Sequence, residues 1–243
     1  MHPIIFQFGP LTIYSYGVML AIAVVVCTFL VSTEARRLGF NPDVIFDIVF
    51  WIVLFGILGA RIFYILLNLE FFLENPLETI MIQKGGLAWQ GSLIAGGLVG
   101  VWLIQKRRLP LFQMLDLFAP YIALGQAIGR IGCFLNGCCF GREVPWGIYF
   151  PVHDAHLHPT QIYESLGLLI VFAAVRLYQG ISKIEGSVFV FYLILASLLR
   201  FIVEFFRGDH ELVWGNLSLF QFICLGIILA ALFMGWKIRK KGK

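Results

Sequence analysis

The segment Phe118-Ala-Pro-Tyr-Ile-Ala-Leu-Gly-Gln-Ala-Ile-Gly-Arg-Ile-Gly-Cys-Phe-Leu-Asn136 carries an arginine, Arg130, inside a mostly apolar run. A guanidinium at membrane depth costs at least about 2.5–3.5 kcal/mol, so it is retained only where an anionic or polar group meets it. Arg61 and Arg200 lie in two other apolar segments in the same way. Three such cations in one helix bundle would form an anion site within the bilayer, and the anion expected there is a phospholipid phosphate.

The composition places the whole chain in a membrane. Of its 243 residues, 60% are hydrophobic and only 13% are charged, whereas a soluble domain carries about 25% charged residues. No polar stretch is long enough to bury a core of its own, so we expect one membrane-embedded domain over residues 1–243. The net charge of +4 comes from basic residues at the ends of apolar segments. Membrane topology explains them, and no nucleic-acid partner is expected.

Seven segments approach the roughly 20 apolar residues that span a bilayer: 14–33, 44–68, 87–104, 112–135, 161–178, 187–206 and 217–236. Basic residues gather at the joints on one side, whereas the other side has only Lys84, Arg142 and Arg207. The positive-inside rule assigns the basic side to the cytoplasm. We therefore predict an all-α integral membrane protein with seven transmembrane helices, an external N-terminus and a cytoplasmic C-terminus. The basic residues on the cytoplasmic side are Arg36, Arg37, Lys106, Arg107, Arg108, Arg176, Lys183, Lys237, Arg239, Lys240, Lys241 and Lys243.

Two predicted external loops are rich in polar residues. Residues 69–86 carry three glutamates and end in Gly85-Gly86, and we expect a short helix there that lies on the membrane. Residues 137–160 carry His153, His156 and His158. The histidine spacing matches no metal-site template, so no metal is expected in this loop.

Three of the five cysteines, Cys133, Cys138 and Cys139, are close together in sequence. Their spacing matches no zinc or iron–sulfur template, and the vicinal pair Cys138-Cys139 is awkward as joint metal ligands. A structural packing role is therefore the favoured interpretation, and no metal or other cofactor is predicted.

The run Gly129-Arg-Ile-Gly-Cys-Phe-Leu-Asn-Gly-Cys-Cys-Phe-Gly141 resembles the signature of the prolipoprotein diacylglyceryl transferases. The spacing from Asp116 to Arg130 also resembles that of the family. The resemblance covers residues 3–236, nearly the whole chain. Other motifs that resemble the family follow one another in its order: Tyr16-Gly17, Gly59-Ala-Arg61, Gly85-Gly-Leu-Ala-Trp-Gln-Gly91, His158-Pro-Thr-Gln-Ile-Tyr-Glu164 and Arg200-Phe-Ile-Val-Glu-Phe-Phe-Arg207.

The resemblance implies an enzyme of the bacterial cytoplasmic (inner) membrane with an active site toward the outer leaflet. It would move the diacylglyceryl group of phosphatidylglycerol onto the lipobox cysteine thiol of a prolipoprotein signal peptide, and glycerol phosphate would leave. The residues expected to take part in catalysis are Tyr16, Gln90, Arg130, His158 and Arg200. Those expected to bind phosphatidylglycerol are Arg61, Arg130, Asn136, Gly141, Glu204 and Arg207.

The residues themselves fit such a reaction. Arginine stays charged and binds phosphate oxygens through two parallel hydrogen bonds, which suits Arg130 and Arg200 to a departing phosphate. In the alternative interpretation each arginine only pairs with Asp116, Glu164 or Glu204 and locks helices together, and for Arg61 the two interpretations weigh equally. Glu204 would hold an arginine by a salt bridge, or act as a base. Tyr16 and Asn136 offer neutral hydrogen bonds, although Tyr16 also suits an aromatic anchor at the membrane interface.

The general base is the open question. Gln90 occupies a position where the family typically has histidine, and a glutamine side chain does not accept a proton at neutral pH. The signature also departs from the family at Cys133 and Cys138, where asparagine and glutamate are frequent. Three interpretations follow: His158 is the base, or nearby arginines depress the thiol pKa so that no dedicated base is needed, or the chain is a catalytically altered paralogue.

Two other classes of function remain possible from sequence. Buried arginines would suit a transporter or flippase for an anionic lipid, although seven segments without inverted repeats argue against the usual transporter plan. A scaffolding membrane protein is the second alternative, and replacement of Arg130 by lysine would hardly affect it.

Overall fold

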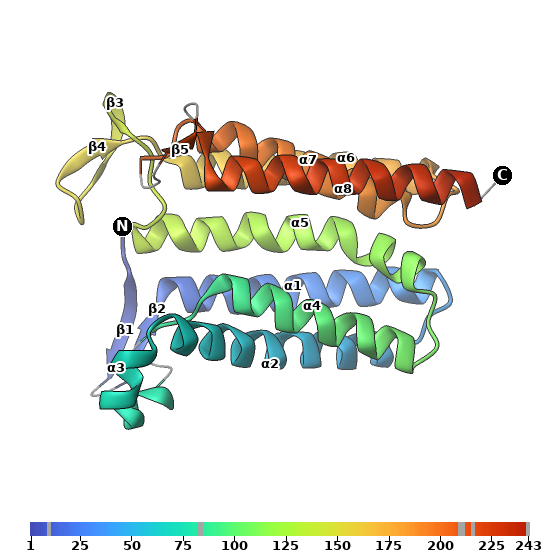
Figure 1. Ribbon diagram of the computed structural model, residues 1–243, viewed down its shortest axis with the longest axis horizontal. Coiled ribbons are helices and arrows are strands. Elements are labelled where there is room, and N and C mark those ends of the chain that lie inside the picture. The colour runs from blue at the N-terminus through green and yellow to red at the C-terminus, as the bar shows by residue number, and fades with distance from the viewer. Residues whose placement is uncertain (9–10, 82–84, 209–211, 215–216, 242–243) are drawn as a thin grey trace. The chain divides into compact units, whose positions relative to one another are not determined.

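Seven long helices dominate the computed structural model, which describes residues 1–8, 11–81, 85–208, 212–214 and 217–241 (Figure 1). Each corresponds to one predicted segment, and the all-α prediction is confirmed. Lys84 and Lys243, which entered the topology argument, lie outside the described residues. The helices are α1 (Ser15–Arg37), α2 (Pro42–Leu67), α4 (Trp89–Lys106), α5 (Leu111–Asn136), α6 (Thr160–Ile181), α7 (Ser187–Glu204) and α8 (Leu219–Lys241).

Within the described residues, six of these helices are long and apolar enough to cross a membrane, as expected of an integral membrane protein. The exception is α4, which is as long as α7 but is less apolar over its 18 residues. Four of them are glycines, and its polar residues Gln90, Gln105 and Lys106 lie near its two ends. Length and composition alone therefore support six crossings and leave the seventh to α4.

The chain divides into two compact units. Unit 1 comprises residues 1–31 and 115–243, and unit 2 comprises residues 32–114. The boundaries fall inside α1 and α5, so each of these helices contributes to both units. Each unit is described below by itself.

In unit 1, helices α6, α7 and α8 run side by side (Figure 1). Small and branched side chains of α5, α6 and α7, among them Ala123, Val175 and Val188, form a shared buried cluster. Asp116 of α5 accepts hydrogen bonds from the backbone N–H groups of Gly186 (2.6 Å) and Phe189 (2.8 Å) at the start of α7. A carboxylate favours the positive end of the helix dipole. Asp116 therefore caps α7, in contrast to the alternative interpretation in which it pairs with an arginine.

In unit 2, α2 and α4 pack against each other along their length. Gly59 and Gly91 allow this, because a Cβ atom built on Gly91 would lie only 2.2 Å from the Gly59 carbonyl oxygen. The chain between them contains the short helix α3 (Leu69–Glu74) and the 3-10 helix η1 (Pro76–Thr79). The short helix predicted within residues 69–86 is thus present, and its placement on the membrane stays a prediction.

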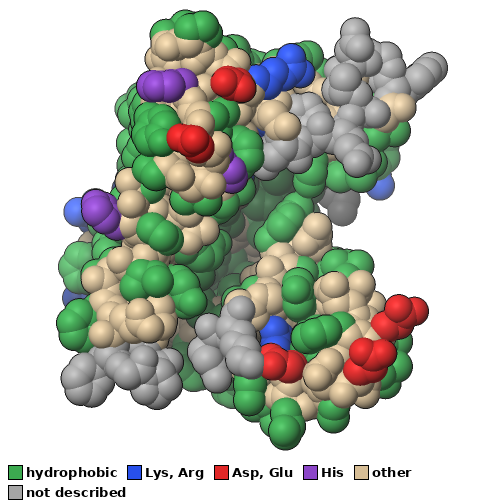
Figure 2. All heavy atoms as spheres, turned by 90° about the vertical axis from the view of Figure 1, so that its left-hand side faces the viewer, with side chains coloured by type: hydrophobic (Ala, Val, Ile, Leu, Met, Phe, Trp, Pro, Cys, Tyr) green, Lys and Arg blue, Asp and Glu red, His purple; other side chains and the backbone are tan. Residues whose placement is uncertain are grey.

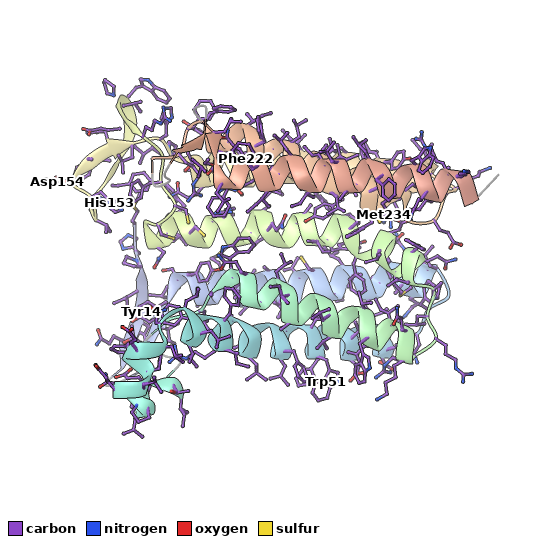
Figure 3. The ribbon with its side chains drawn as sticks, viewed as in Figure 1. Tyr14, Trp51, His153, Asp154, Phe222 and Met234 are labelled. Atoms are coloured by element: carbon purple, nitrogen blue, oxygen red, sulfur yellow. The ribbon has the colours of Figure 1, made fainter. Side chains whose placement is uncertain are left out.

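The described part of unit 1 also contains three short antiparallel strand pairs, which were not predicted from the sequence. Figure 3 shows His153 and Asp154 where the chain turns from β3 to β4. The β3–β4 hairpin occupies most of the predicted loop 137–160. Its strand β4 ends one residue before His158, which lies just before α6. The strands are β1 (Ile4–Phe8) with β2 (Leu11–Tyr14), β3 (Glu143–Phe150) with β4 (Ala155–Leu157), and β5 (Leu212–Trp214) with β6 (Leu217–Ser218).

Candidate active site

Three arginines and two glutamates of unit 1 form one ionic network. Nη2 of Arg130 lies 2.9 Å from Oε1 of Glu164. Nη2 of Arg200 lies 2.7 Å from Oε2 of Glu204, and Nε of Arg207 lies 3.8 Å from the same oxygen. Arg200 also interacts electrostatically with Glu164 and Arg130, which joins the two pairs. Three cations share two carboxylates, so the five groups together carry an excess of positive charge.

The positions of these residues on and near the helices determine which side chains of the network are buried and which are partly exposed. Arg200 and Glu204 are four residues apart and lie on one face of the last turn of α7, and Arg207 follows three residues after the helix ends. The carboxylates lie deepest: the side chain of Glu204 is only 1% exposed and that of Glu164 is 7% exposed. The arginine side chains remain 11–25% exposed. The glutamates thus hold the inner side of the network, and the guanidinium groups are the parts that an external group can reach.

Arg200 and Glu204 form a close, largely buried ion pair within the network. Glu204 accepts a hydrogen bond from Oγ of Ser218 (2.7 Å) in addition to its ion pairs. By contrast, Nη1 of Arg200 is buried and has no hydrogen-bond partner within the described part of the chain. A buried donor without a partner is costly, and in native structures such a group calls for a specific explanation. The guanidinium carbon lies 5.4 Å from the Phe220 ring centroid, so one charged donor of the network is packed near an aromatic ring with no hydrogen-bond acceptor among the described residues.

Tyr16 joins this network from the first turn of α1. Its hydroxyl interacts electrostatically with Arg130 and with the three clustered cysteines. Gly132 makes the approach of α1 to α5 possible, because a Cβ atom there would lie 3.3 Å from the Tyr16 Cα and 3.0 Å from the Met19 Cβ. Asn136, the last residue of α5, makes a side-chain hydrogen bond with Cys138. The structure thus brings Tyr16 and Asn136 to the side of Arg130 that faces the cysteines.

The three cysteines meet in space. The Sγ atoms of Cys133, Cys138 and Cys139 all lie within 4.8 Å of one another, and all three residues are half-buried. A sharp turn after α5 achieves this, with positive φ at Gly137 (77°) and at Cys139 (63°). Hydrogen bonds from Cys133 and Cys138 lower the pKa of the Cys139 thiol, and the charges of Arg130 and Arg207 lower it further, against the effect of burial.

The start of α6 holds this turn in place. Nε2 of Gln161 donates to the Cys138 carbonyl (2.6 Å), and Oγ1 of Thr160 donates to the Cys139 carbonyl (2.7 Å). The cysteines were expected to be packing residues, because their spacing matches no template for metal ligands, and this cluster was therefore not predicted. Gly137, which permits the chain to reverse direction after α5, was the sequence feature that could have indicated the cluster.

Gly141 and His158 lie next to each other beside the network. The Gly141 N–H donates to the His158 carbonyl (2.9 Å), and Gly141 pairs with Arg207 in an isolated β-bridge. A Cβ atom on Gly141 would lie 2.4 Å from the His158 Cβ and 2.5 Å from the Phe206 carbonyl oxygen. Gly141 therefore acts through close packing, and any side chain there would push the end of α7 away from His158.

The His158 ring is held by aromatic neighbours. Its Nδ1 lies 3.2 Å from the Tyr163 hydroxyl, and its centroid lies 4.6 Å from that of Trp146 and 5.5 Å from that of Phe206. The residue is 9% exposed. Histidine side chains also appear on the surface shown in Figure 2, where the loops of this end gather. Among the described residues, the His158 ring thus contacts aromatic rings and a hydroxyl and no charged group of the network.

Arg61 belongs to unit 2 and is committed to backbone. It donates to the carbonyls of Glu78, Thr79 (3.1 Å), Gly85 (2.8 Å) and Gly86 (3.0 Å), and it is 7% exposed. Gly85 and Gly86 both have positive φ, which glycine adopts without cost. This geometry favours the interpretation in which Arg61 has a structural role over the one in which it binds a phosphate. Gln90 is half-buried in the first turn of α4, and this helix begins just after the loop that Arg61 holds.

A different hollow lies at the other end of unit 1. A groove of about 270 Å³ there is lined by residues of α6, α7 and α8, including Tyr178, Ser187 and Trp236. Its lining is mostly apolar and contains none of the predicted site residues. We therefore place the candidate active site at the ionic network and not at this groove.

Comparison with known proteins gives a consistent result. A model of the prolipoprotein diacylglyceryl transferase family matches residues 3–237. A phosphatidylglycerol--prolipoprotein diacylglyceryl transferase of Clostridium tetani is 36% identical, with 96% of each chain covered. Proteins with the same name from Halalkalibacterium halodurans and Trichormus variabilis are 34% and 36% identical. They cover 97% and 98% of this chain and 86% and 90% of their own length.

Proposed function

The chain belongs to the prolipoprotein diacylglyceryl transferase family, and on that premise we propose that it transfers the diacylglyceryl group of phosphatidylglycerol to the lipobox cysteine of a prolipoprotein. The thiol sulfur attacks the glycerol carbon that carries the phosphate, a C–S thioether forms, and the C–O bond to the phosphate breaks. Glycerol phosphate leaves, and the thiol proton passes to solvent or to a base. The observation that carries this proposal is the family match over residues 3–237, together with the excess positive charge of the ionic network.

The arginines suit the leaving group. The departing phosphate monoester gains negative charge as the C–O bond breaks, and fixed donors aimed at developing charge are among the strongest aids to catalysis. Arg130 and Arg200 offer such donors at the exposed side of the network, and the buried Nη1 of Arg200 has no partner within the described residues. We assign both arginines to the phosphate of phosphatidylglycerol, as catalytic residues.

The other predicted residues take supporting roles. Glu204 holds Arg200 and Arg207, and Arg207 adds positive charge next to the phosphate. Tyr16 and Asn136 supply hydrogen bonds to the lipid headgroup from the α1 and α5 sides. Gly141 shapes the binding site through its close contact with the end of α7. Arg61 acts at a distance: it fixes the loop that precedes Gln90, and Gln90 orients substrate without moving a proton.

Activation of the thiol by cations fits the geometry better than a histidine base. His158 Nδ1 is directed to the Tyr163 hydroxyl, and its ring is packed among aromatic side chains. A thiol with a pKa of about 8.5 is converted to its nucleophilic form by neighbouring cations. A substrate thiol at the ionic network meets that condition, because the network carries more arginines than carboxylates.

We also propose that the enzyme lies in the bacterial cytoplasmic membrane with this site toward the outer leaflet. The site is formed by the last turns of α5 and α7, the residues that follow them and the first turns of α6, whereas the basic residues Arg176 and Lys237 lie toward the C-terminal ends of α6 and α8. The positive-inside rule assigns the latter ends to the cytoplasm. Seven crossings, with α4 included, give the external N-terminus and the cytoplasmic C-terminus.

The test is direct. The purified protein is incubated with phosphatidylglycerol and a lipobox peptide, and the peptide is analysed by mass spectrometry. A mass increase of one diacylglyceryl group on the cysteine supports the proposal, and a peptide with serine in place of cysteine must stay unmodified. A transporter or flippase for anionic lipids, or a catalytically altered relative, would leave both peptide and lipid covalently unchanged.

A further inference from the structure

The cysteine cluster has the composition of a metal site that is open on one side. Among the described residues, Cys133, Cys138 and Cys139 are the only group of three or more potential metal-ligating side chains in one place. Catalytic zinc sites keep three protein ligands and leave the fourth position to water or substrate, whereas structural sites use four. Three thiols without a fourth protein ligand therefore match the open kind.

The distances fit a single ion. With zinc–sulfur bonds of about 2.3 Å, two thiolates on a tetrahedral zinc lie about 3.8 Å apart. The three Sγ atoms already lie within 4.8 Å of one another, so closure around an ion requires shifts of the order of 1 Å. The turn that carries Cys138 and Cys139 is pinned by Gln161 and Thr160 through its carbonyl groups. The Cys138 thiol is held by a long hydrogen bond to the Cys133 carbonyl (3.7 Å) and by its bond with Asn136, so small rotations of the side chains can bring the sulfur atoms together.

The surrounding charge suits a metal–thiolate group. Three thiolates and a divalent cation carry a net negative charge, and a further bound thiolate increases it. Arg130 and Arg207 both interact electrostatically with Cys139, and Arg130 also interacts with Cys133. Because the arginine network holds more cations than carboxylates, it can balance a negatively charged metal–thiolate group beside it.

We propose that Cys133, Cys138 and Cys139 bind a zinc ion whose fourth position takes the lipobox cysteine thiolate, beside the arginines that hold the lipid phosphate. This inference rests on the proposed function, because it assigns the activation of that reaction's nucleophile.

The step balances without any redox partner. The lipobox thiol displaces a water molecule from the metal and loses its proton to solvent, because a coordinated thiol is deprotonated outright. The metal-bound sulfur then attacks the glycerol carbon of phosphatidylglycerol. A C–S bond forms, the C–O bond breaks, and the phosphate monoester leaves with both bonding electrons toward Arg130 and Arg200. The thioether product is a neutral and weaker ligand than the thiolate, so it leaves the metal.

The site is tested first by metal binding to the full chain in detergent, with Co²⁺ as the spectroscopic probe for zinc. We expect a near-ultraviolet sulfur-to-cobalt charge-transfer band and displacement of Co²⁺ by Zn²⁺. Cys133→Ser, Cys138→Ser or Cys139→Ser should each lower the Co²⁺ affinity at least about tenfold, as loss of groups that support a metal does. Cys27→Ser and Cys224→Ser, which change thiols outside the cluster, are the matched controls and should leave the spectrum unchanged.

A second readout needs no variant and so does not depend on the variants folding. Bound Zn²⁺ should protect Cys133, Cys138 and Cys139 from alkylation, as measured by peptide mass spectrometry, while the labelling of Cys27 and Cys224 stays the same. Equal labelling with and without Zn²⁺ would overturn the proposal. So would a disulfide between two of the three cysteines in protein isolated from the membrane, because an oxidised pair cannot supply the ligands.

The role of the metal is tested with the substrate. Addition of a lipobox peptide to the Co²⁺ protein should change the visible cobalt bands, and the peptide with serine in place of cysteine should not. Removal of metal should lower lipid transfer at least tenfold, and Zn²⁺ should restore it. Full transfer by metal-free protein would refute the inference and leave the proposed function intact. A cobalt–thiolate spectrum in a protein that never transfers lipid would refute the proposed function and, with it, the catalytic role of the metal.

Discussion

Arg130 offers the sharpest test of a single side chain. Its Nη2 atom pairs with Glu164, and a quarter of its side chain remains exposed. Lysine keeps the charge but loses the planar fork that binds two phosphate oxygens together. We expect Arg130→Lys to lower kcat/KM for lipid transfer by about 1.5–3 kcal/mol, the worth of a hydrogen bond to a charged group, or roughly 10- to 150-fold. Initial rates measured at several phosphatidylglycerol concentrations give this value.

Arg36→Lys is the control for that prediction. Arg36 is exposed in the last turn of α1, so its replacement should leave the rate unchanged. Equal activity of Arg130→Lys and wild type would show that Arg130 contributes only its charge to the protein and does not form a bidentate phosphate contact.

Glu204 separates the two roles that the sequence left open. Its carboxylate is buried and holds Arg200 and Arg207. Removing one partner of a buried ion pair costs about 3–5 kcal/mol, because the remaining charge is left uncompensated. If Glu204 is a bridge, Glu204→Gln lowers the thermal unfolding temperature in detergent, and the residual activity keeps the wild-type pH dependence. The exposed Glu70 of α3 provides the matched Glu→Gln control.

The opposite result for Glu204 would be equally informative. A Glu204→Gln protein that unfolds at the wild-type temperature yet has no transferase activity at any pH would identify the carboxylate as a base. The bridge interpretation would then be wrong.

Single residues also mark the limit of sequence reasoning. The cost of burying a guanidinium correctly singled out Arg130, Arg200 and Arg61 as residues that need a partner. It did not identify the partners. Arg61 turned out to donate to backbone carbonyls 17 to 25 residues further along the chain. That choice depends on how a loop with two positive-φ glycines folds back, which no local pattern encodes.

At the scale of elements, the contact between α2 and α4 depends on glycine. A Cβ atom on Gly91 would meet the Gly59 carbonyl oxygen at 2.2 Å and the Phe63 Cβ at 2.5 Å. We expect Gly91→Ala to force the helices apart and to destabilise the protein by about 1–3 kcal/mol, the usual cost of overpacking. Thermal unfolding in detergent measures the effect.

Gly97 on the same helix provides the control, because a Cβ atom there has no neighbour within 4 Å. Gly97→Ala should be neutral, or stabilising by up to about 1 kcal/mol through helix propensity. If the two variants unfolded at the same temperature, close packing at Gly91 would not hold the helix pair together.

Elements were predictable in proportion to their periodicity and length. The seven helices follow from apolar runs of about 20 residues, which is a long and redundant signal. The hairpin β3–β4 has no such signal, because strands of eight and three residues carry too few alternating positions to stand out from a loop. The cysteine cluster was missed for the same reason: it depends on one turn after α5, where Gly137 and Cys139 adopt positive φ.

For the whole molecule, the side on which each terminus lies depends on α4. Its 18 residues span about 27 Å at 1.5 Å per residue, close to the roughly 30 Å of a bilayer core. It packs along α2, and Arg107, just after its end, pairs with Asp47 near the start of α2. Two helices in close contact along the length of the shorter one share a depth in the membrane more easily than a crossing helix and a surface helix do.

Whether the number of membrane crossings is odd or even can be tested from the sides on which the termini and loops lie. Seven crossings place the termini on opposite sides, whereas six place them on the same side. We expect green fluorescent protein fused after Lys243 to fluoresce, since it folds in the cytoplasm. Alkaline phosphatase inserted at the exposed Trp146 of β3 should be active, since it needs the external compartment. The same enzyme inserted after Arg108 should be inactive.

Active phosphatase at Arg108 would show that α4 does not cross the membrane, contrary to the topology predicted from the positions of the basic residues. The arginine network would still share one membrane side with Trp146, because both belong to unit 1 and lie at the same ends of α5 and α6.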